Sequence, residues 1–450
     1  MRLTFYGGAK TVTGANYILE AENGEKIMID CGLLQGGHYA ENKNFEDFPY
    51  NPEEIGAVFV THAHIDHIGR LPKLISNGFK GTVYSTEPTK AFAKSLLEDS
   101  VDILAREAKR YGKPGFCRQG DIKKLMNQWQ EVVYHQKITH GPFLVTFYDA
   151  GHILGSAFIK IEADGKSVVF SGDLGNSPAP LIKERELIPT DIDYVFMESA
   201  YGGEKHEPRE GVMDKLEDII EATVKRNGVL LIPAFAMERT QILLHHIHDL
   251  MSSKKIPKAL VFLDSPLAIR VTEVYKTFAD VLDRETQKFL REGHNLFEFP
   301  NLYRTETTEE SKAIWKKESP KIIIAGAGMS QGGRILHHEK RYLPDSKNAI
   351  VFVGYQVKGS LGRKILDGAK KVKINGDEIP VRAQVFRISE YSSHADQPQL
   401  LEWLKPARFD LKKVFLIQGE EAQMEILSSK IQDRLAVEVE IPEEGDSVSL

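Results

Sequence analysis

Four side chains that can bind a metal ion lie within six residues of sequence. They are His62, His64, Asp66 and His67, and they directly follow the apolar segment AVFVT. Ligands this close together cannot all face one point from a regular strand or helix, so we expect a loop that shares them between two adjacent metal ions. Imidazole nitrogen and carboxylate oxygen are the ligands that zinc prefers in catalytic sites. The spacing is far more typical of a metal site than of structural histidines.

Two further candidate ligands also follow predicted strands. His152 lies in DAGHILGS after FLVTFY, and Asp173 lies in FSGDLG after SVVF. The repeated order of strand, glycine turn and ligand predicts that these side chains meet at one edge of a sheet sandwich. A lone histidine such as His152 is more often structural than a ligand, so the repetition carries the prediction. Asp30, at the end of KIMID, is either a turn former or an acceptor that orients a ligand histidine.

A pair of metal ions at such a site would suit one class of reaction. Two zinc ions about 3.5–4 Å apart bind a hydroxide whose pKa falls to about 7, which provides a nucleophile at neutral pH. The ions also offset the charge that develops on a phosphorane-like transition state. A phosphodiester needs both effects, so the pattern favours a phosphodiester as the substrate.

These motifs resemble those of the metallo-β-lactamase superfamily and, within it, the β-CASP nucleases, over nearly the whole chain. The resemblance implies a zinc-dependent endoribonuclease that acts on single-stranded RNA, with 5′-exonuclease activity as an additional candidate and DNA as an open alternative. It implies that six side chains hold two zinc ions: His62, His64 and His152 hold the first, Asp66 and His67 hold the second, and Asp173 bridges both. Asp30 matches the first motif of the family.

A second pair of residues would supply the proton. Glu198 ends the apolar segment IDYVFMES, and His394 lies in EYSSHADQ. Taken alone, they would be a carboxylate at a strand end and a turn residue. The resemblance implies that Glu198 supports His394 and that His394 protonates the leaving oxygen, a role that suits an imidazole with a pKa of about 6.5. With Asp66, they are the predicted catalytic residues.

A glycine-rich segment, IAGAGMSQGGR, joins an apolar strand to a helix. Its pattern differs from the dinucleotide-binding GxGxxG. It is either a tight packing turn or a loop whose backbone N–H groups bind an anion. The resemblance favours a loop that binds substrate phosphate. The predicted RNA contacts are Gly328, Met329, Ser330, Gly332, Gly333 and Arg334 in this loop, followed by Lys358, Ser360 and Arg363.

One position departs from the family pattern. The last family motif is usually a histidine followed by Gly-Glu, and here Gln418 precedes Gly419-Glu420. A glutamine oxygen is a weak zinc ligand compared with imidazole. The second zinc could bind weakly with water in that position, a harder ion such as Mn²⁺ could replace it, activity could be lost with RNA binding kept, or the glutamine could be an introduced change. Because every other motif is present, we favour a working or recently weakened enzyme.

The elements that must position these residues change character along the chain. Residues 1–202 read as many short strands with one clear helix at about 89–111, and residues 376–450 return to that style. Residues 203–375 alternate apolar strands with helices, which predicts a parallel sheet covered on both faces. We therefore expect an α/β fold: a metallo-β-lactamase αββα sandwich with an inserted α/β domain of the β-CASP type. Such an insert disfavours a hydrolase of small esters, which needs no such cover.

Composition sets the remaining limits. The 450 residues contain only two cysteines and no apolar stretch long enough to span a membrane, so we expect a reducing, cytoplasmic location. The net charge of −6 argues mildly against a nucleic-acid binder, although a local basic groove is sufficient. The expected partner is single-stranded RNA, the main alternative is a weakened RNA-binding or scaffold homologue, and a homodimer is a candidate state.

Overall fold

The computed structural model describes the chain except residues 37, 207–210, 355, 357–358 and 389–390. The chain forms two compact units, each of which is described by itself. Unit 1 comprises Met1–Lys205 and His394–Leu450, and unit 2 comprises His206–Ser393. Unit 2 is thus inserted into unit 1. The sequence indicates an insertion because a stretch of alternating strands and helices separates two stretches that are rich in short strands.

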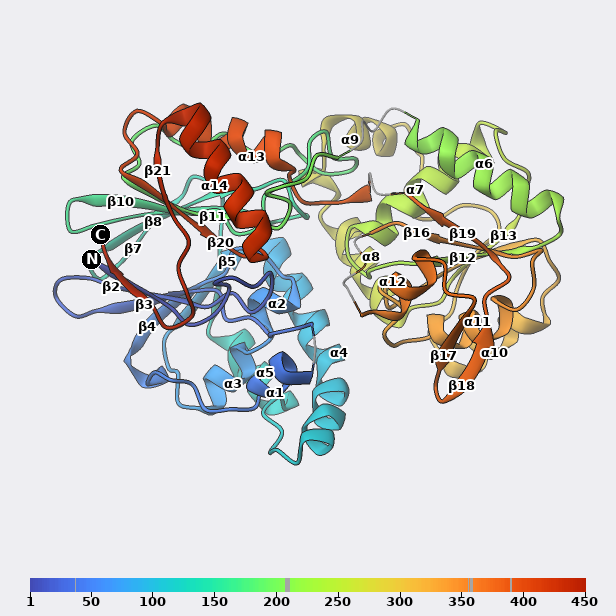
Figure 1. Cartoon of the computed structure of the whole chain (residues 1–450), viewed down its shortest axis with the longest axis horizontal. Coiled ribbons are helices and arrows are strands. Elements are labelled where there is room, and N and C mark those ends of the chain that lie inside the picture. Colours follow the sequence, from blue (N-terminus) through green and yellow to red (C-terminus); the bar gives the residue numbers. More distant parts are fainter. Residues whose placement is uncertain (37, 207–210, 355, 357–358, 389–390) are drawn as a thin grey trace. The chain divides into compact units, whose positions relative to one another are not determined.

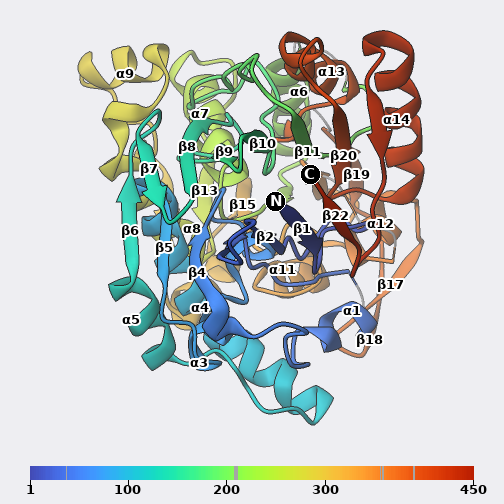
Figure 2. The same cartoon turned by 90° about the vertical axis from the view of Figure 1, so that its left-hand side faces the viewer.

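Unit 1 contains two seven-stranded sheets. The first has, in spatial order, β22 (Ser447–Ser449), β1 (Arg2–Phe5), β2 (Tyr17–Glu20), β3 (Lys26–Ile29), β4 (Ile55–Phe59), β5 (Thr82–Thr86) and β6 (Trp129–Val132). The second has β21 (Glu438–Glu440), β20 (Lys413–Ile417), β11 (Tyr194–Glu198), β10 (Lys166–Phe170), β9 (Ala157–Ala163), β8 (Phe143–Asp149) and β7 (Lys137–His140). The outermost strand β22 pairs with β1, so the two termini lie side by side (Figures 1 and 2).

The two sheets pack face to face through aromatic side chains. Phe196 on β11 lies against Phe5 on β1 of the other sheet, with ring centroids 6.0 Å apart; within its own sheet it stacks between Phe170 and Phe415, at 4.6 and 4.8 Å. Its neighbours Val195 and Met197 belong to a separate core on the other face of the sheet. This alternation follows from the two-residue period of a strand, and it buries both faces of β11. The buried strand therefore ends with Glu198 at a fixed position.

Helices cover the outer faces of both sheets. Trp403 and Leu404 of one helix and Leu427 of another pack on the second sheet. The helices of unit 1 are α1 (His38–Lys43), α2 (Ile65–Ile68), α3 (Leu71–Ser76), α4 (Glu87–Tyr111), α5 (Gln119–Asn127), α13 (Gln397–Leu404) and α14 (Glu421–Leu435). Helices outside two stacked sheets give the expected αββα order of layers.

Helix α4 is the long helix that the sequence predicts at about 89–111. It begins where the Thr86 hydroxyl accepts a hydrogen bond from the Thr89 amide and ends at Gly112, whose φ of 65° suits glycine. Its buried side chains include Phe92, Leu97 and Leu104. Figure 2 shows its C-terminal part extending away from the two sheets.

Unit 2 is built on a six-stranded parallel sheet. Its spatial order is β14 (Leu302–Arg304), β13 (Leu260–Leu263), β15 (Lys321–Ala325), β12 (Val229–Pro233), β16 (Ala349–Phe352) and β19 (Gln384–Arg387). Its helices are α6 (Val212–Lys225), α7 (Arg239–Ser252), α8 (Pro266–Thr277), α9 (Arg284–Arg291), α10 (Thr308–Ala313), α11 (Ile335–Tyr342) and α12 (Leu361–Leu366). Figure 1 shows α6 and α7 on one face of this sheet and α11 and α12 on the other. Coverage of both faces explains why β12 and β15 are buried throughout and, apart from Lys321 at the start of β15, apolar.

Unit 2 extends further along the chain than the expected boundary at residue 376. Strand β18 (Asp377–Pro380) pairs with β17 (Lys371–Ile374), and β19 pairs with β16. The β-rich character of this stretch suggests the sandwich, but its strands extend the inserted unit. Strand pairing, which composition does not reveal, sets the boundary at Ser393. In the described part of the chain, every helix is too short or too polar to cross a bilayer.

Candidate metal centre

The cluster His62, His64, Asp66 and His67 lies where the sequence predicts it, at the end of a buried strand. Strand β4 ends at Phe59, the next residues form a loop, and α2 begins at Ile65. His62 and His64 therefore come from the loop, whereas Asp66 and His67 come from the first turns of α2. This change from loop to helix sends the side chains in two directions within six residues of sequence.

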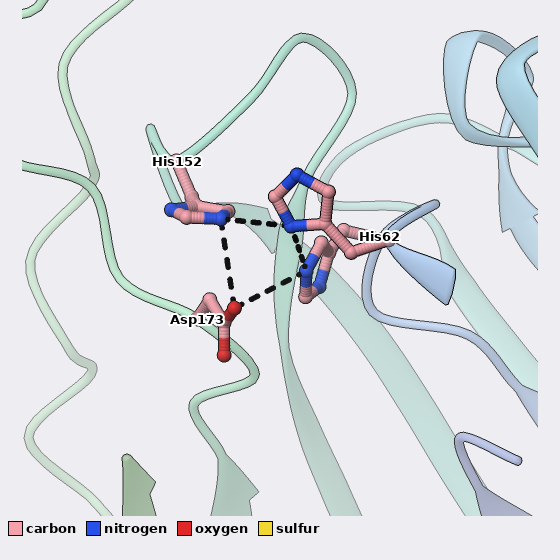
Figure 3. A group of neighbouring side chains, drawn as sticks. His62, His152 and Asp173 are labelled. Carbon is pink, nitrogen blue, oxygen red and sulfur yellow. Dashed lines mark hydrogen bonds and ion pairs between the residues drawn. The ribbon is translucent and has the colours of Figure 1, made fainter. Parts of the chain in front are cut away.

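Three histidines and one carboxylate converge at one point (Figure 3). The His64 Nδ1 atom lies 3.0 Å from His62 Nε2 and 3.2 Å from His152 Nε2. The Asp173 Oδ2 atom lies 3.3 Å from His62 Nε2 and 3.5 Å from His152 Nε2. One ligand atom from each of the four residues lies within 4.8 Å of all the others. We name these four residues the first ligand set.

The first ligand set has the chemistry that zinc requires. Burial lowers the pKa of His62, and it lowers the pKa values of His64 and His152 well below the ordinary value. The imidazoles are therefore neutral, and their lone pairs can bind a cation. Three imidazole nitrogens and one carboxylate oxygen match the tetrahedral donor sets of zinc sites. The residues present thus fit the ion.

A second, looser set lies on the other side of Asp173. The Asp173 Oδ1 atom is 3.5 Å from His67 Nε2, and Asp66 Oδ2 is 4.0 Å from the same nitrogen. Between them, the Gln418 side-chain amide donates to His67 Nε2 at 2.9 Å and to Asp173 Oδ1 at 3.0 Å. The Gln418 Oε1 atom is buried and has no hydrogen-bond partner among the described residues. We name Asp66, His67, Asp173 and Gln418 the second ligand set.

Asp30 connects to both sets through a residue that the sequence analysis does not single out. Its Oδ1 accepts from the Thr61 amide at 2.8 Å, and its Oδ2 accepts from the Thr61 hydroxyl and from His67 Nδ1, both at 2.7 Å. The Thr61 oxygen lies 3.1 Å from His62 Nδ1. Protons on both Nδ1 atoms leave the Nε2 atoms of His62 and His67 for a metal. The available signal for Thr61 is its place directly before the first histidine.

Glu198 and His394 form a pair beside the first ligand set. The Glu198 Oε2 atom lies 3.2 Å from His394 Nδ1, and Oε1 accepts from the Leu174 amide at 2.5 Å. Glu198 is fully buried, and burial raises its pKa while His394 opposes that change. The His394 ring centroid is 4.6 Å from that of His152. The pair therefore borders the point where the first ligand set converges.

The predicted phosphate loop lies in unit 2, and its side chains are engaged within that unit. The guanidinium of Arg334 donates to Asp264 Oδ1 at 2.7 Å and to the Thr305 carbonyl at 2.8 Å. Ser330 is buried, and its hydroxyl donates to Glu339. Arg334 therefore anchors the loop to the end of β13. A buried carboxylate partner is the reason, and the local sequence does not contain it.

The remaining predicted RNA contacts that the structure describes form hydrogen bonds or ion pairs within unit 2. The Gly328 carbonyl accepts from Gln356, and the Met329 carbonyl accepts from the Gly362 amide. Ser360 caps α12 by accepting from the Arg363 amide, and Arg363 pairs with Asp367 at 2.8 Å. Two glycines complete the loop, at Gly332 and Gly333. The last predicted contact, Lys358, lies outside the described residues.

Comparison with known proteins gives consistent matches along the chain. Residues 11–190 match the family model of the metallo-beta-lactamase superfamily, and residues 240–365 match the Beta-Casp domain. Residues 378–442 match the Zn-dependent metallo-hydrolase RNA specificity domain.

Several curated proteins are similar over most of their length. "Ribonuclease TTHA0252" of Thermus thermophilus is 37% identical over 100% of both chains. "Transcription termination factor FttA" of Methanocaldococcus jannaschii is 31% identical over 94% of this chain and 67% of its own. "Integrator complex subunit 11" of Gallus gallus is 30% identical over 98% of this chain and 73% of its own. A solved structure, a protein of unknown function from Enterococcus faecalis, shares the fold with a TM-score of 0.58 at 14% identity, over 100% of this chain and 99% of its own.

Proposed function

The chain belongs to the β-CASP family of the metallo-β-lactamase superfamily, and on that premise we propose that it is a zinc-dependent ribonuclease. The observation that carries the proposal is the convergence of three imidazoles and one carboxylate beside the Glu198–His394 pair. A metal ligand set next to a carboxylate-supported imidazole provides for both a nucleophile and a proton donor.

The first ligand set would hold one zinc ion, and the second ligand set would hold another weakly. When bound, zinc supplies a hydroxide at neutral pH and offsets charge on the phosphate. The two oxygens of Asp173 face the two sets separately, which suits a carboxylate that bridges two ions. The neutral amide of Gln418 stands in the second set, so Mn²⁺ with added water is the alternative there.

The chain's own residues would handle the proton. The Glu198 carboxylate would accept a hydrogen bond from the Nδ1–H of His394 and thereby stabilise the charged imidazolium. The other ring nitrogen can then carry a second proton to the leaving oxygen. Because Glu198 is buried and held by the Leu174 amide, its carboxylate keeps the imidazole in one orientation.

RNA is the substrate class that the comparisons favour. The C-terminal match is to an RNA specificity domain, and a relative that is similar over its full length is a ribonuclease. Endonucleolytic cleavage is our first expectation, and 5′-exonuclease activity is a second. One observation favours a different function: Gln418 fills the second set with hydrogen bonds, as expected of a homologue that binds RNA without cutting it.

A cleavage assay separates these functions. Labelled single-stranded RNA is incubated with the purified chain and with added Zn²⁺ or Mn²⁺. We expect cleavage that His64→Ala abolishes. His135→Ala is a matched control, because this histidine is 58% exposed and its side chain contacts Glu186 and Tyr148 outside the metal centre. RNA binding without cleavage by the unaltered chain would refute the nuclease and support the binding homologue.

A further inference from the structure

A group of unpaired cations lies at the far end of α4, away from the metal centre. We infer that this surface binds the phosphate backbone of the RNA at a distance from the cleavage point. The inference deepens the proposed function and rests on RNA being the substrate. It concerns long RNA substrates, because short ones cannot reach both places.

The far end of α4 and the start of α5 are positively charged, although the whole chain has a net negative charge. Residues 102–124 contain seven basic and three acidic side chains, whereas the whole chain carries a net charge of −6. All seven basic side chains are exposed, and none makes an ion pair within the described chain. We name them the distal basic patch: Arg106, Lys109, Arg110, Lys113, Arg118, Lys123 and Lys124.

Helix α4 arranges the first four of these cations. Arg106, Lys109, Arg110 and Lys113 follow a spacing of three and four, which places them on one face of α4 and its end. Basic residues at a helix C-terminus also complement the helix dipole, but only Lys109 and Arg110 occupy the last turn. The dipole therefore does not explain the other five cations.

Helix α5 continues the patch. Arg118 directly precedes α5, and Lys123 and Lys124 are exposed on it, while Ile122 and Leu125 are buried. The apolar side chains face the body of unit 1, so the charged side chains remain in solvent. Five of the seven cations thus lie on two neighbouring helices, and Lys113 and Arg118 lie on the segment that connects them.

The position of the patch follows from the length of α4. The helix begins beside the His152 loop, where Thr86 and Thr89 both donate to the Gly155 carbonyl, at 2.6 and 2.9 Å. Its 25 residues at about 1.5 Å per residue give a length of about 37 Å. The far end extends away from the sheets (Figures 1 and 2). At about 3.4 Å per phosphate, roughly ten nucleotides would span that distance.

Phosphate is the ligand that suits this surface. Clustered lysines and arginines release counterions from a phosphate backbone and bind it without reading its sequence. The surplus negative charge of the chain repels RNA, so a local positive surface is needed to retain a long strand. Acidic proteins and anionic membranes also carry negative charge, so the experiment includes phosphatidylserine vesicles for comparison.

The test compares two triple variants with the same change in charge. The patch variant carries Arg106→Gln, Lys109→Gln and Arg110→Gln. The control variant carries Lys80→Gln, Lys137→Gln and Lys405→Gln, which are exposed elsewhere on unit 1. Binding of a 30-nucleotide and a six-nucleotide RNA is measured by fluorescence anisotropy over a range of salt concentrations. All chains carry His394→Asn to suppress cleavage, so the result does not depend on nuclease activity.

We expect the patch variant to bind the long RNA about tenfold or more weakly, with a salt slope lower by roughly two, since each lost single-strand contact contributes about 0.7. The control variant and the short RNA should change less than twofold. Equal affinity of the patch and control variants for the long RNA would overturn the inference, as would an equal loss for both RNAs. Unchanged RNA binding with lost binding to phosphatidylserine vesicles would also overturn it. A second patch variant leaves α4 unchanged and carries Arg118→Gln, Lys123→Gln and Lys124→Gln, at the start of α5 and within it. Weaker binding of the long RNA by this variant as well would exclude misfolding of α4 as the cause.

Discussion

The two sides of Asp173 differ in how completely they are built. On one side, three neutral imidazoles meet the carboxylate at distances of 3.3 Å or more and leave a point that a cation can occupy. On the other side, an amide donates two hydrogen bonds into the corresponding position. The first ligand set turns neutral imidazole nitrogens and a carboxylate toward one point, whereas in the second set the Gln418 amide already donates to His67 Nε2 and Asp173 Oδ1. The comparison teaches that two adjacent sites sharing one ligand need not have equal affinity.

The largest effect should come from removing a ligand of the first set. We expect His64→Ala to lower zinc affinity and to reduce RNA cleavage by about a thousandfold or more, because the metal supplies several kcal/mol of transition-state stabilisation. Zinc content by elemental analysis and the initial cleavage rate are the measurements. Retention of a full zinc complement by this variant would contradict the assignment of the first set.

The next effect should come from the proton donor without any change in metal content. His394→Asn and Glu198→Gln should each lower kcat by about 10²–10⁴-fold, the range for general acid catalysis. A loss of zinc in either variant would show that the pair acts as ligands and not as the proton donor.

A smaller effect should follow from removing a hydroxyl that supports both ligand sets. Thr61→Val removes the hydroxyl that lies between Asp30 and His62, and should weaken zinc binding by about 10–100-fold. Thr61→Ser keeps the hydroxyl and is the matched control. Isothermal titration of zinc into the metal-free chain measures both. Equal zinc affinities of the two variants would show that the Thr61 hydroxyl does not support the metal ligands.

The smallest effect should come from completing the second set. Gln418→His places an imidazole where the amide now donates, and should raise the zinc content from nearer one ion to two per chain, with a rate increase of up to about tenfold. Gln418→Asn is the control, because it shortens the amide without adding a ligand. An unchanged zinc count in Gln418→His would show that the amide does not limit the second site.

The fold and most of the ligand positions follow from the sequence because they depend on local order. An apolar strand followed by a loop of histidines fixes both the element and its end, as at His62 and His64. Long-range partners are a different matter. The pairing of Arg334 with Asp264 joins the start of α11 to the end of β13, 70 residues away in sequence. The place of Gln418 between His67 and Asp173 depends on the packing of three elements. Thr61 is ordinary in sequence and acquires its role only through Asp30.

One consequence concerns the order in which the chain is made. Strands β11 and β20 are parallel neighbours, with Glu198 opposite Ile417, although the whole of unit 2 lies between them in sequence. His394 and Gln418 leave the ribosome only after unit 2 has been synthesised. A partly translated chain therefore lacks both the proton donor and the last strand beneath the centre. If the proposed activity is correct, such timing would withhold it from the nascent polypeptide while the ribosome still holds it on its own message.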